Sequence, residues 1–123
     1  MKAADVEVVD LQEKFGQFSD HWCPRIVADL NGQQVKLARL EGEFVWHSHA
    51  EEDEMFLVIE GQLRLELRDR TLELGPGQMA VVPRGVEHRP VAEEEVQVML
   101  FEPASTVNTG NVGGDRTVDP RRL

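Results

Sequence analysis

The sequence has 123 residues, enough for one domain with a single core. Its 23 acidic residues outnumber its 13 lysines and arginines, and the formal net charge of −10 argues against a nucleic-acid partner, whose phosphates would be repelled. A lone cysteine, Cys23, excludes an intrachain disulfide, and no segment has the length of a signal peptide's apolar region or of a membrane span. We therefore expect a soluble cytoplasmic protein with no membrane partner.

The first regular element that we expect is a short helix at residues 10–18. Asp10 is a candidate N-cap, and Glu13 follows three residues later, a spacing that resembles a capping box. This helix would be an appendage, because the rest of the sequence has the pattern of an all-β protein.

Six short apolar or alternating runs follow, separated by Gly, Pro and Asp at intervals of about 8 to 12 residues, which predicts a sandwich or a barrel. They are residues 33–40, 55–60, 62–67, 71–74, 78–83 and 96–102. In the third run, leucines alternate with polar residues, as in a strand with one exposed face. The second run does not alternate, which favours a strand covered on both faces, by the opposite sheet and a loop or by a second subunit.

The C-terminal residues 105–123 differ in composition from the rest of the chain. They are polar, rich in glycine and free of aromatic residues, so they can bury little surface. We expect an extended tail that lies on the barrel or on a partner, or is partly disordered.

A pair of histidines precedes the acidic stretch at 51–54. Residues two apart on an extended chain point the same way, so His47 and His49 would share a face while Ser48 points away. Among the four acids, Glu54 is best placed to join the imidazoles because it opens the next apolar run. The other three fall in the turn, where acids are usually solvated.

A third histidine, His88, follows the turn residues Pro83 and Gly85 in a short extended piece. Three imidazoles and one carboxylate would hold a first-row divalent metal. Imidazole suits zinc, copper, iron and nickel, and a carboxylate extends the range to manganese.

The remaining candidates have simpler interpretations. His21 is best explained as structural or exposed. Trp22 and Trp46 are typical of a core rather than of ligand stacking. Cys23 is expected to be an inert buried thiol, because no neighbour would lower its pKa.

These residues carry a resemblance to the cupin family. The first cupin motif is Gly, five residues, His-x-His, three or four residues, Glu, six residues, Gly. The chain resembles it with four residues rather than five in the first gap, at Gly42, His47, His49, Glu54 and Gly61.

The second cupin motif is Gly, five residues, Pro-x-Gly, two residues, His, three residues, Asn. All of its spacings are matched by Gly77, Pro83, Gly85 and His88, and Ala92 stands where Asn is usual. That Asn is not a metal ligand in the family, so its absence leaves the expected metal site intact.

The resemblance implies an all-β fold, a small antiparallel jelly-roll barrel at 22–103, with an N-terminal segment at 1–21 that carries the short helix and an extended tail at 104–123. It also implies a divalent transition metal, Fe, Mn, Ni or Zn, inside the barrel near its mouth. The implied ligands are His47, His49, Glu54 and His88.

Cupins include dioxygenases, isomerases, epimerases, decarboxylases, sensors and storage proteins, so the fold does not select a reaction. The intact ligand set favours a metal-dependent enzyme acting on a small oxygenated molecule, of dioxygenase or isomerase type. The lack of an obvious further acid or base favours a barrel that binds or senses a small molecule without turnover. A purely structural metal is a third alternative.

Two further expectations concern the ligand and the assembly. Arg39 would bind an anionic ligand if it pointed into the cavity, although an exposed strand arginine is the simpler reading. The apolar run at 55–60 and the two terminal segments predict a homodimer.

Overall fold

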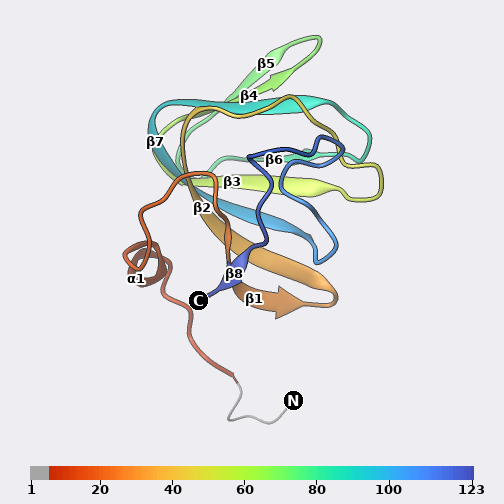
Figure 1. Cartoon of the computed structure of the whole chain (residues 1–123). Helices are drawn as coiled ribbons and strands as arrows, with labels where there is room; N and C mark the ends of the chain where they lie inside the picture. The colour runs from red at the N-terminus through yellow and green to blue at the C-terminus, as the bar shows by residue number, and fades with distance from the viewer. Residues whose placement is uncertain (1–5) are drawn as a thin grey trace.

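The computed structural model of the chain describes residues 6–123 and has one helix and eight strands within that range (Figure 1). They are α1 (Leu11–Phe15), β1 (Arg25–Leu30), β2 (Gln33–Glu43), β3 (Glu54–Glu60), β4 (Leu63–Leu67), β5 (Thr71–Leu74), β6 (Met79–Val82), β7 (His88–Pro103) and β8 (Arg121–Arg122). The strands form the predicted all-β jelly-roll barrel, and all their pairings except β1 with β8 are antiparallel.

Strand β7 is the central strand of the barrel. Its 16 residues pair with β2 over most of their length, with β3 toward the C-terminal end and with β4 toward the N-terminal end. Alternate side chains of these strands point inward, where they form one apolar core. The buried members of that core are Ala38, Leu40, Phe56, Val58, Leu63, Leu65, Leu74, Val82, Ala92, Val96, Val98 and Leu100.

The helix α1 begins as the sequence predicts. The Asp10 side chain accepts a hydrogen bond of 3.1 Å from the backbone N–H of Glu13. The helix ends at Phe15 rather than at Phe18, and it packs outside the barrel core, where both phenylalanines contact Leu37 of β2.

Arg39 of β2 holds this N-terminal segment in place. Its guanidinium donates hydrogen bonds to the carbonyl oxygens of Phe15 (2.8 Å) and Phe18 (3.0 Å), and it pairs with Glu95 at 2.8 Å. Arg39 therefore points away from the barrel interior, and the idea that it binds an anionic ligand there is wrong. It is not freely exposed either, since its side chain retains 19% of its accessible surface.

The strand β3 alternates in burial, so within one chain the opposite sheet and a loop do not fully cover both of its faces. Cover of the outer face by a second subunit, the other arrangement that the sequence allowed, stays a prediction. Phe56 and Val58 are buried in the core, whereas the opposite face carries three half-buried residues, Met55, Leu57 and Ile59.

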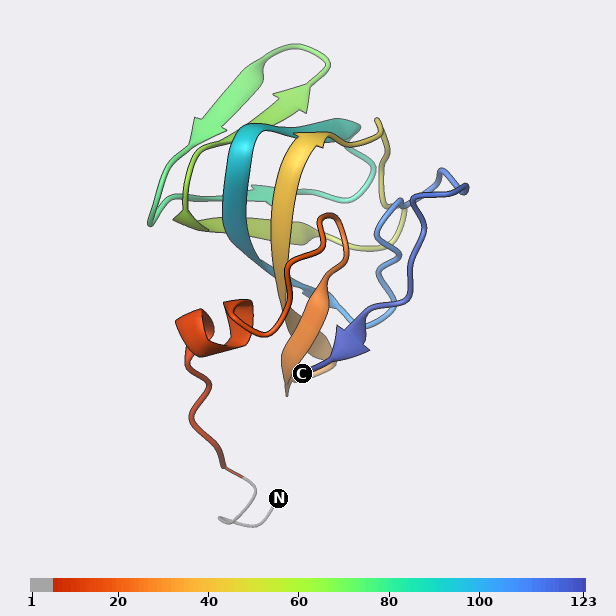
Figure 2. The same cartoon turned by 60° about the vertical axis from the view of Figure 1, so that its left-hand side comes forward.

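The C-terminal tail lies on the barrel, one of the arrangements that the sequence allowed. Figure 2 shows the tail running along one side of the barrel before β8 reaches β1, where Arg121 and Arg122 pair in parallel with Arg25 and Ile26. Thr109 in the middle of the tail is 1% exposed. Within residues 6–123, no helix is long and apolar enough to span a membrane.

Candidate metal centre

The four candidate ligands come from three places on the chain. His47 and His49 lie in the connection between β2 and β3, Glu54 is the first residue of β3, and His88 is the first residue of β7. His47 and His88 are joined by two backbone hydrogen bonds, of 3.0 Å and 2.9 Å, in an isolated antiparallel bridge. This bridge sets two ligands that are 41 positions apart in the sequence side by side.

The four side chains form a compact buried cluster. Their potential ligand atoms all lie within 4.8 Å of one another, and each residue is at most 4% exposed. The cluster could hold a metal ion, because a divalent metal bound by imidazoles and a carboxylate needs donors gathered in this way. The structure thus brings together the residues that the sequence singled out.

Two backbone carbonyls fix the imidazoles. The Nδ1 atom of His47 donates to the carbonyl oxygen of Val45 at 2.9 Å, and the Nδ1 atom of His88 donates to that of Val86 at 3.0 Å. Because the Nδ1 atoms carry the proton, the Nε2 atoms are left with a free lone pair. Such outer contacts orient metal-binding histidines, and the sequence could not name them because they are main-chain atoms.

Several polar atoms of the cluster have no hydrogen-bond partner within the described part of the chain. They are both ring nitrogens of His49, Nε2 of His88 and Oε1 of Glu54. The two Nε2 atoms approach Oε1 to 3.4 Å and 3.3 Å, without hydrogen-bond geometry. Buried polar atoms in native proteins are rarely left unpaired, and a metal ion among these atoms would satisfy them. The residues present therefore fit a divalent metal.

The protonation states also suit a metal. Burial, and then the nearby His88, lowers the pKa of His47 to about 4. Burial alone would raise the pKa of Glu54, but the adjacent imidazoles of His49 and His88 hold it well below its ordinary value. At neutral pH the cluster contains a neutral imidazole at His47 and a carboxylate at Glu54, the forms that bind metals.

A pocket reaches the cluster from one side. It is small, with a volume of about 40 Å³ available to the centres of water-sized molecules, and His47 and Glu54 line it, whereas His49 and His88 do not. Its walls are largely apolar, and Trp22 stacks on Phe44 there at a centroid distance of 4.7 Å. A ligand in the pocket would therefore reach the cluster at His47 and Glu54.

The tail closes part of this pocket. Four of its residues line the cavity: Thr106, Asn108, Val118 and Pro120. Backbone and side-chain hydrogen bonds between Asn111 and Ser48, at 2.9 Å and 2.8 Å, hold the tail against the histidine segment. The tail is thus part of the site and not merely an extension of the barrel.

The pocket also contains an acid and a base that sequence reasoning missed. Lys36 of β2 and Glu102 of β7 face each other with 3.7 Å between Nζ and Oε2, and their side chains are 4% and 2% exposed. Burial, and then the neighbouring Glu54, raises the pKa of Glu102 well above its ordinary value. The alternation of β7 contained the signal, because Glu102 is in phase with the buried Val98 and Leu100.

The remaining candidates lie away from the cluster. Asp53 is exposed and pairs with Arg84, and Glu52 accepts a hydrogen bond from Ser105. His21 is 3.6 Å from Glu95 on the outside of the barrel, with its side chain 35% exposed. Burial raises the pKa of the Cys23 thiol, which agrees with an inert cysteine. His21 is thus partly exposed, within the range expected, whereas Cys23 is only partly buried rather than buried as expected.

The barrel and the buried cluster define a class of protein, the small jelly-roll barrels able to hold a metal ion inside. The chain matches the cupin domain family, Cupin_2, over residues 31–102, and it belongs to that family. The match ends before the tail, so the tail residues that line the pocket lie outside it.

Known proteins agree with this assignment. The chain is similar to the cupin-2 domain protein of Shewanella frigidimarina, with 49% identity and a TM-score of 0.77 over 78% of this chain and 94% of that one. It resembles protein NMB1881 of Neisseria meningitidis, with 31% identity and a TM-score of 0.73 over 79% and 99% of the two chains. It is 33% identical to the uncharacterized protein YdbB of Bacillus subtilis over 65% of this chain, and the match spans 66%, just under two thirds, of that relative's length.

Proposed function

We propose that the protein is a divalent-metal-dependent enzyme that acts on a small oxygenated molecule, of dioxygenase or isomerase type. The proposed ligands are His47, His49, Glu54 and His88. The observation that carries the proposal is the group of buried, unpartnered ligand atoms that borders an apolar pocket on one side. We place the activity in the cytoplasm, because a chain with a single cysteine forms no intrachain disulfide and so does not need an oxidising compartment.

A bound Fe, Mn, Ni or Zn ion would supply Lewis acidity or, in the case of iron, a site for dioxygen. The protein's own contribution is to orient the substrate and to exclude water. Phe44, Phe56 and Leu100 supply apolar walls, and the tail covers part of the mouth. In such a partly dry site, electrostatic interactions with the substrate are stronger than in water.

A binding or sensing barrel without turnover is the second candidate. It is favoured by the ion pair of Lys36 and Glu102, because the buried acid and base of the pocket face each other rather than a reacting atom. Turnover distinguishes the two candidates, since both require the same metal and the same pocket.

Metal content tests the proposal first. We would measure it by plasma mass spectrometry on protein purified without tag or chelator, in the wild type, in His49→Ala and in the matched control His21→Ala. We expect stoichiometric metal in the wild type and in the control and its loss in His49→Ala, because His21 lies outside the cluster. A wild type without metal, or equal metal in His49→Ala, would contradict the proposal.

Activity assays then separate the two candidates. Oxygen uptake or isomerisation of small hydroxy and oxo compounds by the metal-loaded protein supports the enzyme. Stoichiometric metal and ligand binding without turnover supports the sensing barrel. Chelation that leaves the melting temperature unchanged would count against a structural metal, because an ion bound only by the folded state adds stability.

We also propose that the protein is a homodimer. The outer face of β6, β3 and β7 carries a continuous apolar patch, in which Leu57 lies between Met79 and Met99, and Met55 lies between Val81 and Phe101. Met79 and Val81 are each 53% exposed. Apolar patches of this kind on soluble proteins mark interaction sites, and a second copy would cover the patch symmetrically.

Gel filtration tests the dimer. We expect elution near about 28 kDa, twice the chain mass of 13.9 kDa, and a shift to the monomer for the variant Met79→Glu/Val81→Glu. Leu30→Glu is a matched control, because Leu30 is an equally exposed apolar residue (56%) at the end of β1, outside the patch. A monomeric wild type would contradict the proposal.

A further inference from the structure

Lys36 is a buried cation whose partner does not saturate it. The Nζ atom lies 3.7 Å from Glu102 Oε2, beyond hydrogen-bond distance, so the three N–H donors of the ammonium are not consumed by that carboxylate. Burying an ammonium costs several kcal/mol unless it is paired and hydrogen-bonded. The Lys36 side chain is 4% exposed, and its ammonium can still donate hydrogen bonds to a further acceptor.

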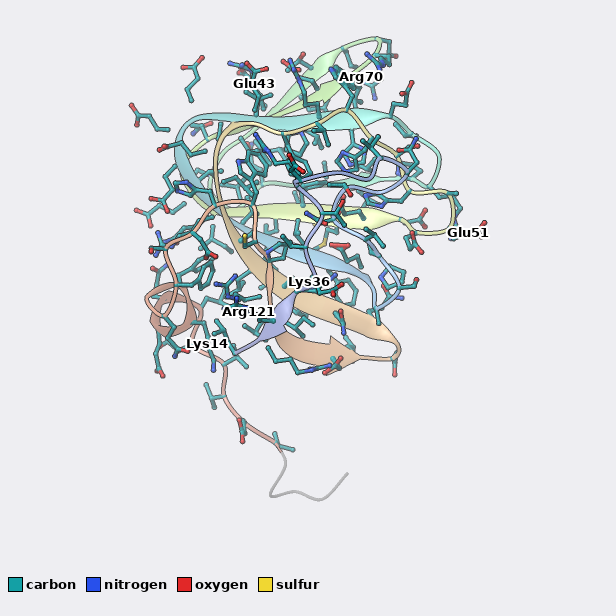
Figure 3. The ribbon with its side chains drawn as sticks, viewed as in Figure 1. Lys14, Lys36, Glu43, Glu51, Arg70 and Arg121 are labelled. Atoms are coloured by element: carbon teal, nitrogen blue, oxygen red, sulfur yellow. The ribbon has the colours of Figure 1, made fainter. Side chains whose placement is uncertain are left out.

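The place where that acceptor would bind is the metal pocket. Lys36 and Glu102 line the same cavity as His47 and Glu54, and Lys36 is the one lysine or arginine among its described lining residues. Figure 3 shows Lys36 within the outline of the barrel, near the C-terminal tail, whereas the labelled Glu51 projects at its edge. Glu102 in turn lies against Glu54, so the ammonium is separated from the ligand cluster by one carboxylate.

The charges of the pocket favour an anion. A divalent metal brings two positive charges, Glu54 and Glu102 bring one negative charge each, and Lys36 brings one positive charge, which leaves the pocket with one positive charge in excess. In a partly closed apolar cavity, this excess attracts an anion although the chain as a whole is strongly acidic.

We propose that Lys36 is the anion-binding residue of this site and that the ligand is a small carboxylic acid with a second oxygen atom. The carboxylate binds the Lys36 ammonium, and the second oxygen, a hydroxyl or carbonyl, faces the metal between His47 and Glu54. This inference rests on the proposed function for the metal and adds the substrate class. Lys36 takes the anion-binding role that the sequence allowed for Arg39, which lies on the outside of the barrel.

The test compares two probes of the same shape, glycolate and its uncharged amide, glycolamide, by calorimetric titration of the Mn²⁺-loaded full chain. The key variant is Lys36→Met/Glu102→Gln, which replaces the buried pair by neutral side chains of similar size. The single change Lys36→Met would leave Glu102 buried without its partner, which is destabilising by itself. Lys36→Arg is the conservative variant that keeps the charge.

We expect the affinity for glycolate to fall about 10- to 100-fold in the double variant, the equivalent of one lost hydrogen bond to a charged group. Glycolamide affinity and bound Mn²⁺ should stay within about threefold, because the metal ligands are untouched, and Lys36→Arg should retain glycolate binding. Intact Mn²⁺ with unchanged glycolate affinity in the double variant, or no glycolate binding by the wild type, would overturn this inference alone. A wild type that binds no Mn²⁺ would overturn the proposed function and the inference with it.

Discussion

Replacing Arg39 by methionine should loosen the N-terminal segment and leave the metal site intact. The guanidinium satisfies the carbonyl oxygens at Phe15 and Phe18, at 2.8 Å and 3.0 Å. Methionine has a similar length and can still pack against the two phenylalanine rings, but it offers no donor. Two carbonyl groups at the junction of α1 and the barrel would then lose their partner.

The expected loss follows from these contacts. A hydrogen bond to a charged group contributes about 1.5 to 3 kcal/mol to stability, and two such bonds are removed. The third contact, with the partly exposed Glu95, adds less than about 1 kcal/mol. Because the bonds share one side chain and the segment can relax, we expect the free energy of unfolding to fall by about 2 to 4 kcal/mol.

Urea denaturation measures this loss, and hydrogen exchange locates it at residues 11–18. Arg64→Met is a matched control, because Arg64 bridges Glu93 at 2.9 Å on the surface of another pair of strands, where the partner is 81% exposed. A surface pair of this kind contributes about 0 to 1 kcal/mol. If Arg39→Met costs no more than Arg64→Met, or if it removes bound metal, the role given to Arg39 is refuted.

Two further predictions concern the tail and the metal-free protein. Gly110→Ala should release residues 104–123 from the barrel, because Gly110 has a φ of +56° and a Cβ there would collide with the carbonyl oxygen of Ser48. The release would be measured as faster proteolysis of the tail. Gly113→Ala is the control, because the space around Gly113 is open, and equal proteolysis of both variants would contradict the prediction. The folded metal-free protein keeps the pKa of His47 at about 4 against 6.5 in the unfolded chain, so the unfolded state binds more protons between these values. Stability in urea should therefore fall by about 3 kcal/mol as the pH drops from 6.5 to 4, and a curve as flat as that of His47→Gln would argue against it.

Much of the fold could be predicted from the sequence because its strands are short and clearly bounded. The run at 71–74 coincides with β5, and the alternating leucines of β4 face the core as expected. The ligand cluster was also accessible, since the two-residue spacing of His47 and His49 places both imidazoles on one side. The position of Glu54 at the start of an apolar run indicated its direction in the same way.

The burial of Glu102 was accessible from the alternation of β7, but that of its partner Lys36 was not accessible from β2 alone. In β2, Val35 and Leu37 make their face look like the core side, yet the opposite face with Lys36 and Ala38 points into the barrel. The choice between the two faces depends on the pairing of Lys36 with Leu100 in β7, a contact between distant parts of the chain. The outward direction of Arg39 was the favoured reading of the sequence, but its contacts with Phe15 and Phe18 were not accessible, because the N-terminal segment has no periodic pattern that indicates where it packs.

The length of β7 has a consequence for how the protein acquires its site. One end of this strand carries His88 and the other carries Glu102, and its pairing with β2 joins residues 48 to 70 positions apart, from Glu43 with Val91 to Gln33 with Pro103. Closing such long loops is the slow step in the folding of β proteins, which typically takes about milliseconds to seconds. The two halves of the pocket therefore meet only after that step, and only then does His88 join the other three ligands, which lie within eight residues of one another.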